Sequence, residues 1–160
     1  MNTAPGGARQ ARAFVAIGAN LGDARATVLE AMQALDRLPG SVVVARSSLW
    51  RSAPVDAGGP DFINAVVALD TTLAPLVLLA EFQRLEADAG RQRPYRNAPR
   101  TLDLDLLSHG EAVLQTPTLT LPHPRMAERA FVLRPLSEIA PERVSQAQLA
   151  RVAGQRIERL

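Results

Sequence analysis

Residues 102–106 have the sequence Leu-Asp-Leu-Asp-Leu, and such strict alternation is typical of a β-strand. Successive side chains of a strand point to opposite faces, so the leucines are expected to face a core while Asp103 and Asp105 share the other face. A rise of about 3.3 Å per residue would place the two aspartate Cα atoms roughly 6.5–7 Å apart. The fold must therefore accommodate two neighbouring carboxylates on one face of a sheet.

Hydrophobic periodicity predicts the elements that surround this strand. Strands are expected over residues 13–18, 41–52 and 62–71, and helices over residues 24–38 and from Pro75 to about Arg91. With the strand that contains the two aspartates, the order is β-α-β-β-α-β. This order is typical of a ferredoxin-like α+β fold, in which an antiparallel sheet carries both helices on one face.

The chain ends and the region after the last strand are expected to add to this core. Residues 1–11 are small, polar and rich in Gly and Pro, which predicts a flexible leader. Residues 110–117 are expected to form a short strand, and residues 122–141 a turn and short helices. The tail 145–160 is expected to be a peripheral helix or partly disordered. No internal repeat or linker marks a second domain, so residues 12–160 are expected to form one domain.

Two residue types are absent from this 160-residue chain, and several kinds of chemistry are excluded with them. Without cysteine, disulfides and thiolate chemistry are excluded, and a zinc site would have only two histidines and carboxylates as ligands. Without lysine, a P-loop lysine and a Schiff base are excluded, and all 18 basic residues are arginines. The net charge of +2 does not by itself indicate a nucleic-acid-binding protein. No apolar run is long enough to span a membrane and no secretory signal precedes the core, so a cytoplasmic location is expected.

Arginine is concentrated just before the two aspartates. Five of the 18 arginines fall within a short segment: Arg84, Arg91, Arg93, Arg96 and Arg100. Carboxylates bind Mg²⁺, which favours oxygen ligands and substrate phosphates, and guanidinium groups bind phosphate oxygens. Paired metal ions about 3.5–4 Å apart would relieve the repulsion between the aspartates, and the combination suits phosphoryl transfer. Ordinary ion pairs on a solvated face explain the same residues about equally well.

Four further side chains are candidates for a ligand site, and each has a structural alternative. Phe62 and Phe131 could stack on a flat ligand ring or pack in the core. Asn64 follows Phe62 by two residues on the same strand face, and its amide could pair with the edge of a heterocycle. His123 lies between two prolines, where it could donate a hydrogen bond to a phosphate oxygen or be a solvated turn residue.

Seven segments occur in order between residues 16 and 141: AIGANLGD, SSLWRSAPV, GPDFINAVVAL, QRLEADAGRQR, PRTLDLDLL, LPHPRM and RAFVLRPLSEIAP. Together they resemble the 6-hydroxymethyl-7,8-dihydropterin pyrophosphokinase family of folate biosynthesis, and PRTLDLDLL with GPDFINA carries most of the specificity. The resemblance implies transfer of a diphosphate group from ATP to the hydroxymethyl oxygen of the pterin. The attack would be at the β-phosphorus, and AMP would be released. We also expect a monomer that binds neither nucleic acid nor membranes.

The resemblance also implies roles for individual residues. Two Mg²⁺ ions would be held by Asp103 and Asp105, and the developing charge would be stabilised by Arg91 and Arg100. The residues that would contact ATP are Gln83, Glu86, Arg93, His123 and Arg129. The pterin would lie between two aromatic rings and be contacted along its amide edge, by Phe62, Phe131, Asn64 and backbone groups of Ser52, Ala53 and Val55. The loops 53–61 and 91–100 would close over the site and exclude water.

Three positions depart from the family pattern. Asn97 stands where a tryptophan is common, and Pro124 follows the histidine where an aromatic residue is common. Phe62 stands where a phenol ring is often found. The first two departures concern the adenine contacts and loop closure, whereas none of the three touches the metal or phosphate chemistry.

Three other functions stay open on the residues alone. A related metal-dependent transferase could use the same aspartates on another substrate, and single phosphoryl transfer would release ADP instead of AMP. An RNA-binding ferredoxin-like module would need exposed aromatic residues on its central strands, but residues 13–18 contain one aromatic side chain. A regulatory module would bind ATP or pterin without turnover.

Overall fold

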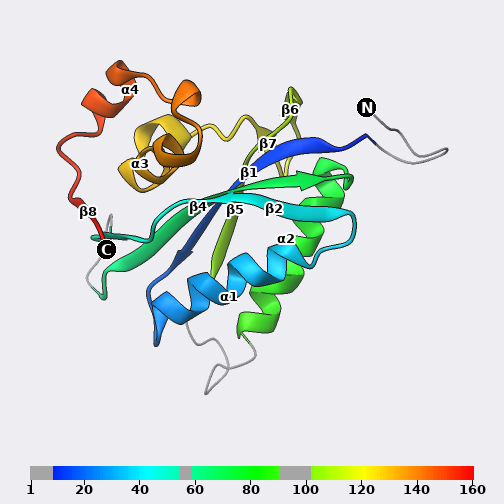
Figure 1. The fold of residues 1–160 in the computed structure, drawn as a ribbon, viewed down its shortest axis with the longest axis horizontal. Helices are drawn as coiled ribbons and strands as arrows, with labels where there is room; N and C mark the ends of the chain where they lie inside the picture. Colours follow the sequence, from blue (N-terminus) through cyan, green and yellow to red (C-terminus); the bar gives the residue numbers. More distant parts are fainter. Residues whose placement is uncertain (1–8, 55–58, 91–101) are drawn as a thin grey trace.

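The computed structural model describes residues 9–54, 59–90 and 102–160, and its centre is an antiparallel sheet (Figure 1). The sheet has the strand order β5-β1-β4-β3-β8, and β2 pairs with β4 beside β3. Its strands are β1 (Ala11–Ala19), β2 (Ser41–Arg46), β3 (Trp50–Ser52), β4 (Phe62–Thr71), β5 (Asp103–His109) and β8 (Ile157–Arg159). Each of these pairings is antiparallel, which confirms the predicted antiparallel sheet.

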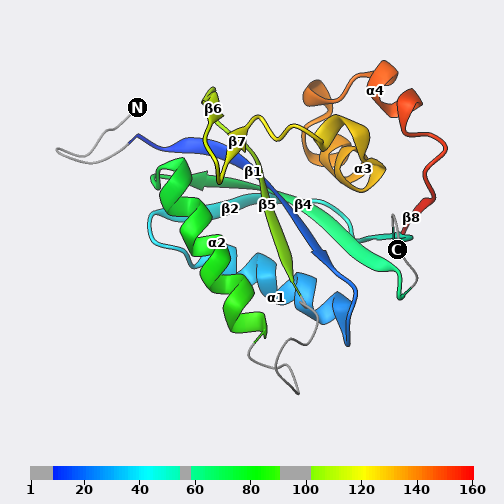
Figure 2. The same cartoon turned by 180° about the vertical axis from the view of Figure 1, so that it is seen from behind.

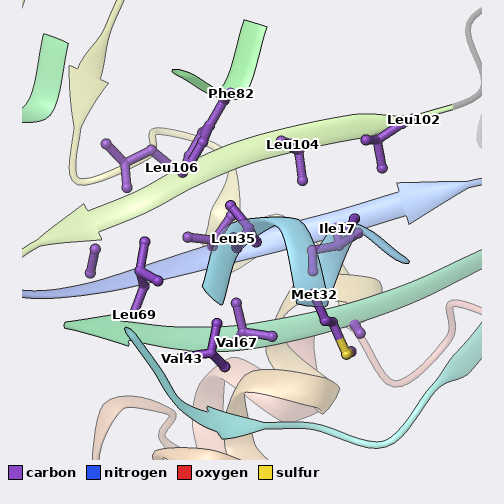
Figure 3. Packing of buried hydrophobic residues seen from close by; sticks show 14 of the residues in the cluster. Ile17, Met32, Leu35, Val43, Val67, Leu69, Phe82, Leu102, Leu104 and Leu106 are labelled. Atoms are coloured by element: carbon purple, nitrogen blue, oxygen red, sulfur yellow. The ribbon is translucent and has the colours of Figure 1, made fainter. Parts of the chain in front are cut away.

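Helices α1 (Ala24–Asp36) and α2 (Pro75–Gly90) cover one face of the sheet (Figures 1 and 2). The Asp23 side chain accepts a hydrogen bond from the Ala26 N–H (3.1 Å) and so caps α1, as an aspartate before an apolar repeat predicts. Leu35 of α1 and Phe82 of α2 are fully buried against the strands (Figure 3). The leucines of the Leu-Asp repeat point into this same core, as predicted from their spacing.

Helix α3 (Ala130–Ile139) packs on part of the opposite face of the sheet (Figures 1 and 2). Val132 and Leu136 of α3 contact a second buried cluster on the strands that includes Phe14 and Val66. Because both faces of β4 are covered, seven consecutive residues of this strand are buried. The end of the sheet that carries Asp103 and Asp105 extends beyond α3.

The remaining elements are short. A two-stranded ribbon is formed by β6 (Leu114–Gln115) and β7 (Thr120–Leu121), which confirms the predicted short strand after β5. The other helices are the 3₁₀ turns η1 (Met126–Glu128) and η2 (Pro141–Arg143) and the α-helix α4 (Gln146–Arg151). Within the described residues, none of the helices has the length and apolar character that crossing a membrane requires.

The predicted strand 41–52 is wrong in one respect, because it is interrupted between β2 and β3. Ser47 bonds to both backbone groups of Val66: its N–H donates to the Val66 carbonyl (2.9 Å), and its hydroxyl accepts from the Val66 N–H (2.9 Å). The side chain thus takes the place of a ladder hydrogen bond, and regular pairing resumes only at Trp50.

The tail 145–160 contains the predicted peripheral helix, but its last residues form a strand and are not disordered. Helix α4 begins with a capping box between Ser145 and Gln148, but residues 157–159 form β8 on the free edge of β3. The Leu160 N–H also donates to the Leu49 carbonyl (3.0 Å). A strand with unpaired backbone groups is a template for another strand, and here the chain's own C-terminal segment covers that edge.

One carboxylate ties α3 to this edge of the sheet. Glu138 accepts hydrogen bonds from the Trp50 indole Nε1 (2.8 Å), the Ser48 N–H (3.0 Å) and the Ser48 hydroxyl (2.8 Å). The Arg159 guanidinium of β8 lies 3.6 Å from the same carboxylate. Burial would raise the pKa of Glu138, but these donors and the charge of Arg159 outweigh burial and lower the pKa below its ordinary value.

We expect Glu138→Ala to lower the free energy of unfolding near neutral pH by about 1–3 kcal/mol, because Trp50 and Ser48 lose a charged acceptor. The folded-state pKa is depressed, so the contribution is complete above the unfolded-state pKa and is lost as the pH falls through the folded-state value. Urea unfolding followed by circular dichroism at decreasing pH measures this difference. Exposed Glu142 is the control position, and a difference between wild type and Glu138→Ala that stayed constant with pH would contradict the argument.

Candidate active site

A cavity of about 930 Å³ lies where the sheet extends beyond the N-terminal end of α3. We call it the cleft. Residues of β1, β4 and β5 form its floor. One wall is formed by the segment that leads into α3, and another by residues 155–157 of the C-terminal tail. Of the residues predicted from the sequence, the following line it: Ser52, Ala53, Phe62, Asn64, Asp103, Asp105, Arg129 and Phe131.

Strand register brings the predicted metal and ring-binding positions onto one row of the sheet. Gly18 of β1 lies opposite Asp103 of β5 on one side and opposite Asn64 of β4 on the other. Residues directly opposite one another share a face, so the carboxylate and the amide lie on the same side of the sheet. Two strand spacings of about 4.8 Å place them roughly 10 Å apart across the cleft floor.

Gly18 keeps the floor between these two side chains open. A Cβ atom at this position would lie 3.2 Å from Asn64 Nδ2 and 4.0 Å from Phe62 Cδ1. A side chain here would therefore crowd the Asn64 amide, which is closer than ordinary van der Waals contact. The glycine leaves room for a flat group on the floor of the cleft.

Asn64 is buried and is held in one orientation by its neighbour. Its Oδ1 accepts a hydrogen bond from the Ser52 hydroxyl (2.6 Å), which directs the Nδ2 amine to the floor above Gly18. The predicted role for the backbone of Ser52 stays a prediction, and its side chain holds the Asn64 amide in position. Because Phe62 and Phe131 line the same cleft, a flat ring there would have aromatic neighbours and a fixed amide donor.

The two aspartates project from an edge strand that is held by α2. The Leu104 N–H, between them in sequence, donates to Glu86 Oε2 (2.8 Å). Glu86 therefore satisfies a backbone donor at the edge of β5 and fixes the strand that carries Asp103 and Asp105. Neither Glu86 nor the exposed Gln83, both predicted to contact nucleotide, is among the residues that line the cleft in the described part of the chain.

His123 is half-buried close to Asp105 and outside the lining of the cleft as the described residues form it. Its backbone N–H donates to the Leu107 carbonyl (2.8 Å), and its ring Nδ1 accepts from the Arg125 backbone N–H (3.1 Å). Burial lowers the pKa of His123, Asp105 opposes this effect, and Arg129 and Arg125 add to it. The ring is therefore neutral near neutral pH, and with Nδ1 as acceptor its proton lies on Nε2, where it can be donated to a ligand.

Arg129 and Phe131 flank the first residue of α3 and lie close together. The Arg129 guanidinium lies over the Phe131 ring, 5.4 Å from the centroid. Both side chains line the cleft, so the wall at the start of α3 combines a cation with an aromatic face. Such a wall suits a ligand that joins a flat ring to an anionic group.

Four predicted site residues lie outside the described residues. They are Val55, Arg91, Arg93 and Arg100, and Asn97 is outside as well. Their roles stay predictions.

Several residues that line the cleft were missed by reasoning from the sequence. Asn20 and Pro54 border its floor, and Arg125 and Glu128 precede α3. From the tail come Gln155, Arg156 and Ile157. Arg125 lies within the segment LPHPRM, which carried part of the family resemblance, and Glu128 directly precedes Arg129, so closeness in sequence to His123 and Arg129 was a usable signal. The tail had no such signal, because it reaches the cleft only through pairing of β8 with β3.

Comparisons with known proteins agree in both sequence and fold. The model of the 7,8-dihydro-6-hydroxymethylpterin-pyrophosphokinase family matches residues 14–141. The chain is 48% identical over 132 residues to the 2-amino-4-hydroxy-6-hydroxymethyldihydropteridine pyrophosphokinase of Pseudomonas aeruginosa, covering 82% of each chain. It is 43% identical over 143 residues to the enzyme of that name from Methylorubrum extorquens, covering 89% of this chain and 90% of the other.

Among solved structures, the chain is similar to the Plasmodium falciparum HPPK-DHPS triple mutant S436F/A437G/A613T with STZ-DHP. The TM-score is 0.67 at 13% identity, over 84% of this chain and 40% of that one. A second HPPK-DHPS structure, in complex with substrates, gives a TM-score of 0.64 at 13% identity, over 88% and 42%. The chain thus spans about two fifths of these longer proteins, and at such identity the likeness concerns the fold alone.

The environment of His123 leads to a test that needs no ligand. We expect Asp105→Asn to lower the pKa of His123 further, because the Asp105 charge opposes the effect of burial, and Arg129→Gln to raise it. Proton NMR titration of the imidazole signals measures both shifts. His109 is the one other histidine in the sequence and serves as internal reference. An unchanged His123 signal, or equal shifts of both histidines, would contradict the electrostatic coupling.

Proposed function

Because the chain belongs to the 7,8-dihydro-6-hydroxymethylpterin-pyrophosphokinase family, we propose that it makes the pterin diphosphate used in folate biosynthesis. It transfers a diphosphate group from ATP to the hydroxymethyl group of 6-hydroxymethyl-7,8-dihydropterin. The observation that carries this proposal is that one cleft is lined by Asn64, Phe62 and Phe131 together with Asp103 and Asp105. Across its floor, Asn64 lies on the other side of Gly18 from Asp103. The aromatic and amide side chains suit the pterin ring, and the neighbouring aspartates suit the metal-bound polyphosphate of ATP, so the hydroxymethyl arm would reach from one site to the other.

The reaction exchanges one phosphorus–oxygen bond for another. The hydroxymethyl oxygen loses its proton to solvent and bonds to the β-phosphorus of ATP. At the same time, the bond between the β-phosphorus and the oxygen that bridges it to the α-phosphorus breaks. AMP leaves with that oxygen. Such transfers depend mainly on positioning and on stabilisation of phosphate charge, so the residues of the cleft act by holding the two substrates in line.

The pterin ring is proposed to lie on the floor above Gly18, between Phe62 and Phe131. Two aromatic neighbours favour a flat heterocycle by stacking. The Asn64 amine, fixed by the Ser52 hydroxyl, would donate to the amide edge of the ring. Backbone groups of Ser52, Ala53 and Val55 are proposed to complete the contacts along that edge.

Asp103 and Asp105 are proposed to hold two Mg²⁺ ions with the polyphosphate. Among the described residues, no three His, Asp or Glu side chains gather into a metal site of their own. Two carboxylates that leave other ligand positions to phosphate and water fit Mg²⁺, which commonly binds through one or two carboxylates plus substrate phosphates. When bound, Mg²⁺ would neutralise charge on the transferred group.

The nucleotide is proposed to lie on the side of the aspartates away from the pterin. His123, neutral and protonated at Nε2, can donate to a phosphate oxygen without a change of charge, and Arg129 adds a cation. Arg93 would contact phosphates, and Arg91 and Arg100 would stabilise the charge that develops during transfer. Residues on α2 are proposed to contact ATP along the edge of β5: Gln83 and Glu86.

The topology supports a finer classification of the fold. If β2 and β3 are counted as one interrupted strand, the core has the order β-α-β-β-α-β with α1 and α2 on one face. We propose that it is a ferredoxin-like core with C-terminal additions, forming one domain. The alternative of an RNA-binding sheet is disfavoured, because α3 covers part of the second face and two carboxylates are among the residues that line the part left open.

Product analysis tests the proposed function directly. Purified protein incubated with ATP, 6-hydroxymethyl-7,8-dihydropterin and Mg²⁺ is expected to form AMP and pterin diphosphate in equal amounts, measured by ion-exchange chromatography. ADP in place of AMP would indicate single phosphoryl transfer. Absence of any nucleotide product would contradict the proposal, and ATP left intact despite pterin binding would indicate a regulatory module.

Substitution of either aspartate tests the proposed phosphate end. Asp103→Asn and Asp105→Asn are each expected to lower kcat by at least about 100-fold, since a charged metal ligand is lost. The thermal unfolding temperature should change little, because one of two neighbouring like charges is removed. Glu111→Gln, an exposed position beyond the far end of β5, is the matched control. A large fall in unfolding temperature with kcat retained would support structural ion pairs instead.

A further inference from the structure

The C-terminal segment forms a wall of the cleft, although no motif in it indicated a site. Figures 1 and 2 show the chain running from α4 past α3 to the edge of the sheet, where β8 ends. Ile157 pairs with Ser52, the residue whose hydroxyl holds Asn64. Gln155 and Arg156, just before β8, also line the cleft.

Gln155 is bonded to the start of α3 on both sides of Arg129. Its Oε1 accepts from the Ala130 N–H (2.8 Å), and its Nε2 donates to the Glu128 carbonyl (2.8 Å). The first N–H groups of a helix have no partner within the helix, and the Arg129 side chain makes no capping hydrogen bond to α3. Gln155 therefore supplies, from 25 residues away, the cap that this helix lacks locally.

Apolar packing supports the same contact. Ala130 and Leu133 of α3 form a small buried cluster with Val152, and Ile157 packs against it. The tail is thus fixed to α3 by a cluster and two hydrogen bonds, and to the sheet by β8. These attachments link the two sides of the cleft, the one at Ser52 and the one at Phe131.

From these contacts we propose that Gln155 is a positioning residue that sets the Phe131 ring and the Arg129 guanidinium over the cleft. The inference rests on the proposed function, because it assigns Phe131 to the pterin. Gln155 acts through the backbone at either side of Arg129 and leaves the aspartates on β5 untouched. Its loss should therefore weaken binding of pterin, through Phe131, and of ATP, through Arg129, more than the transfer step.

The test compares variants in the AMP-forming reaction. Gln155→Leu keeps the approximate size of the side chain and removes both hydrogen bonds, and it is expected to raise the KM for pterin about tenfold with kcat within about twofold. Gln155→Glu keeps an acceptor for the Ala130 N–H, favourable at a helix N-terminus, and should recover much of the affinity. It also serves as the second variant if Gln155→Leu does not fold.

Gln148→Leu is the matched control. Gln148 also makes a short hydrogen bond within the tail, to the Ser145 N–H (2.8 Å), but it belongs to the capping box of α4. If the tail contributes only stability, both leucine variants should lower the unfolding temperature and leave the pterin KM unchanged, and this outcome would overturn the proposal. An equal rise of the pterin KM in both leucine variants would also overturn the proposal. So would a Gln155→Glu enzyme whose pterin KM is as high as that of Gln155→Leu. A wild-type protein that forms no AMP would contradict the proposed function, whereas an active wild type with unaffected Gln155 variants would contradict this inference alone.

Discussion

The site depends on the register that places Asp103, Gly18 and Asn64 in one row of the sheet. Hydrogen bonding between β5, β1 and β4 fixes this row, and a slip of one residue would turn each side chain to the other face. Leu104 and Leu106 of β5 and Val15 and Ile17 of β1 are buried under α1 and α2, so a slip would also expose the core. Core packing and the geometry of the cleft are therefore set by the same pairing.

The wall opposite the sheet is assembled differently. Helix α3 is held to the strands by Val132 and Leu136 beneath it, by the bonds of Glu138 to Trp50 and Ser48, and by Gln155 at its start. The bonds of Glu138 and Gln155 are polar contacts between segments distant in the sequence, each worth about 1 kcal/mol or somewhat more. The floor is thus built into the sheet, whereas the wall is a docked element with several separate attachments.

The helices and strands that are set by the spacing of apolar residues along the chain were predicted from the sequence. The strand 62–71 was predicted with the bounds that β4 has, and α1 was predicted from the spacing of its apolar residues. The break between β2 and β3 depends on bonds from Ser47 to Val66, and no local pattern reports a bond between strands. For the site, the ring, amide and acidic positions lay in recognisable segments, whereas Gln155 and Ile157 reach the cleft only through tertiary pairing.

The environment of Trp50 offers a means of observing the docked wall. It is the sole tryptophan of the chain, its side chain is almost fully enclosed, and its indole N–H is bonded to Glu138. The Arg134 guanidinium lies 5.6 Å from the centre of its ring, and Ser52 of the cleft is two residues away. Indole emission depends on nearby charge and on exposure to water. The emission of this one indole thus reports, without labelling, whether α3 is seated on the sheet.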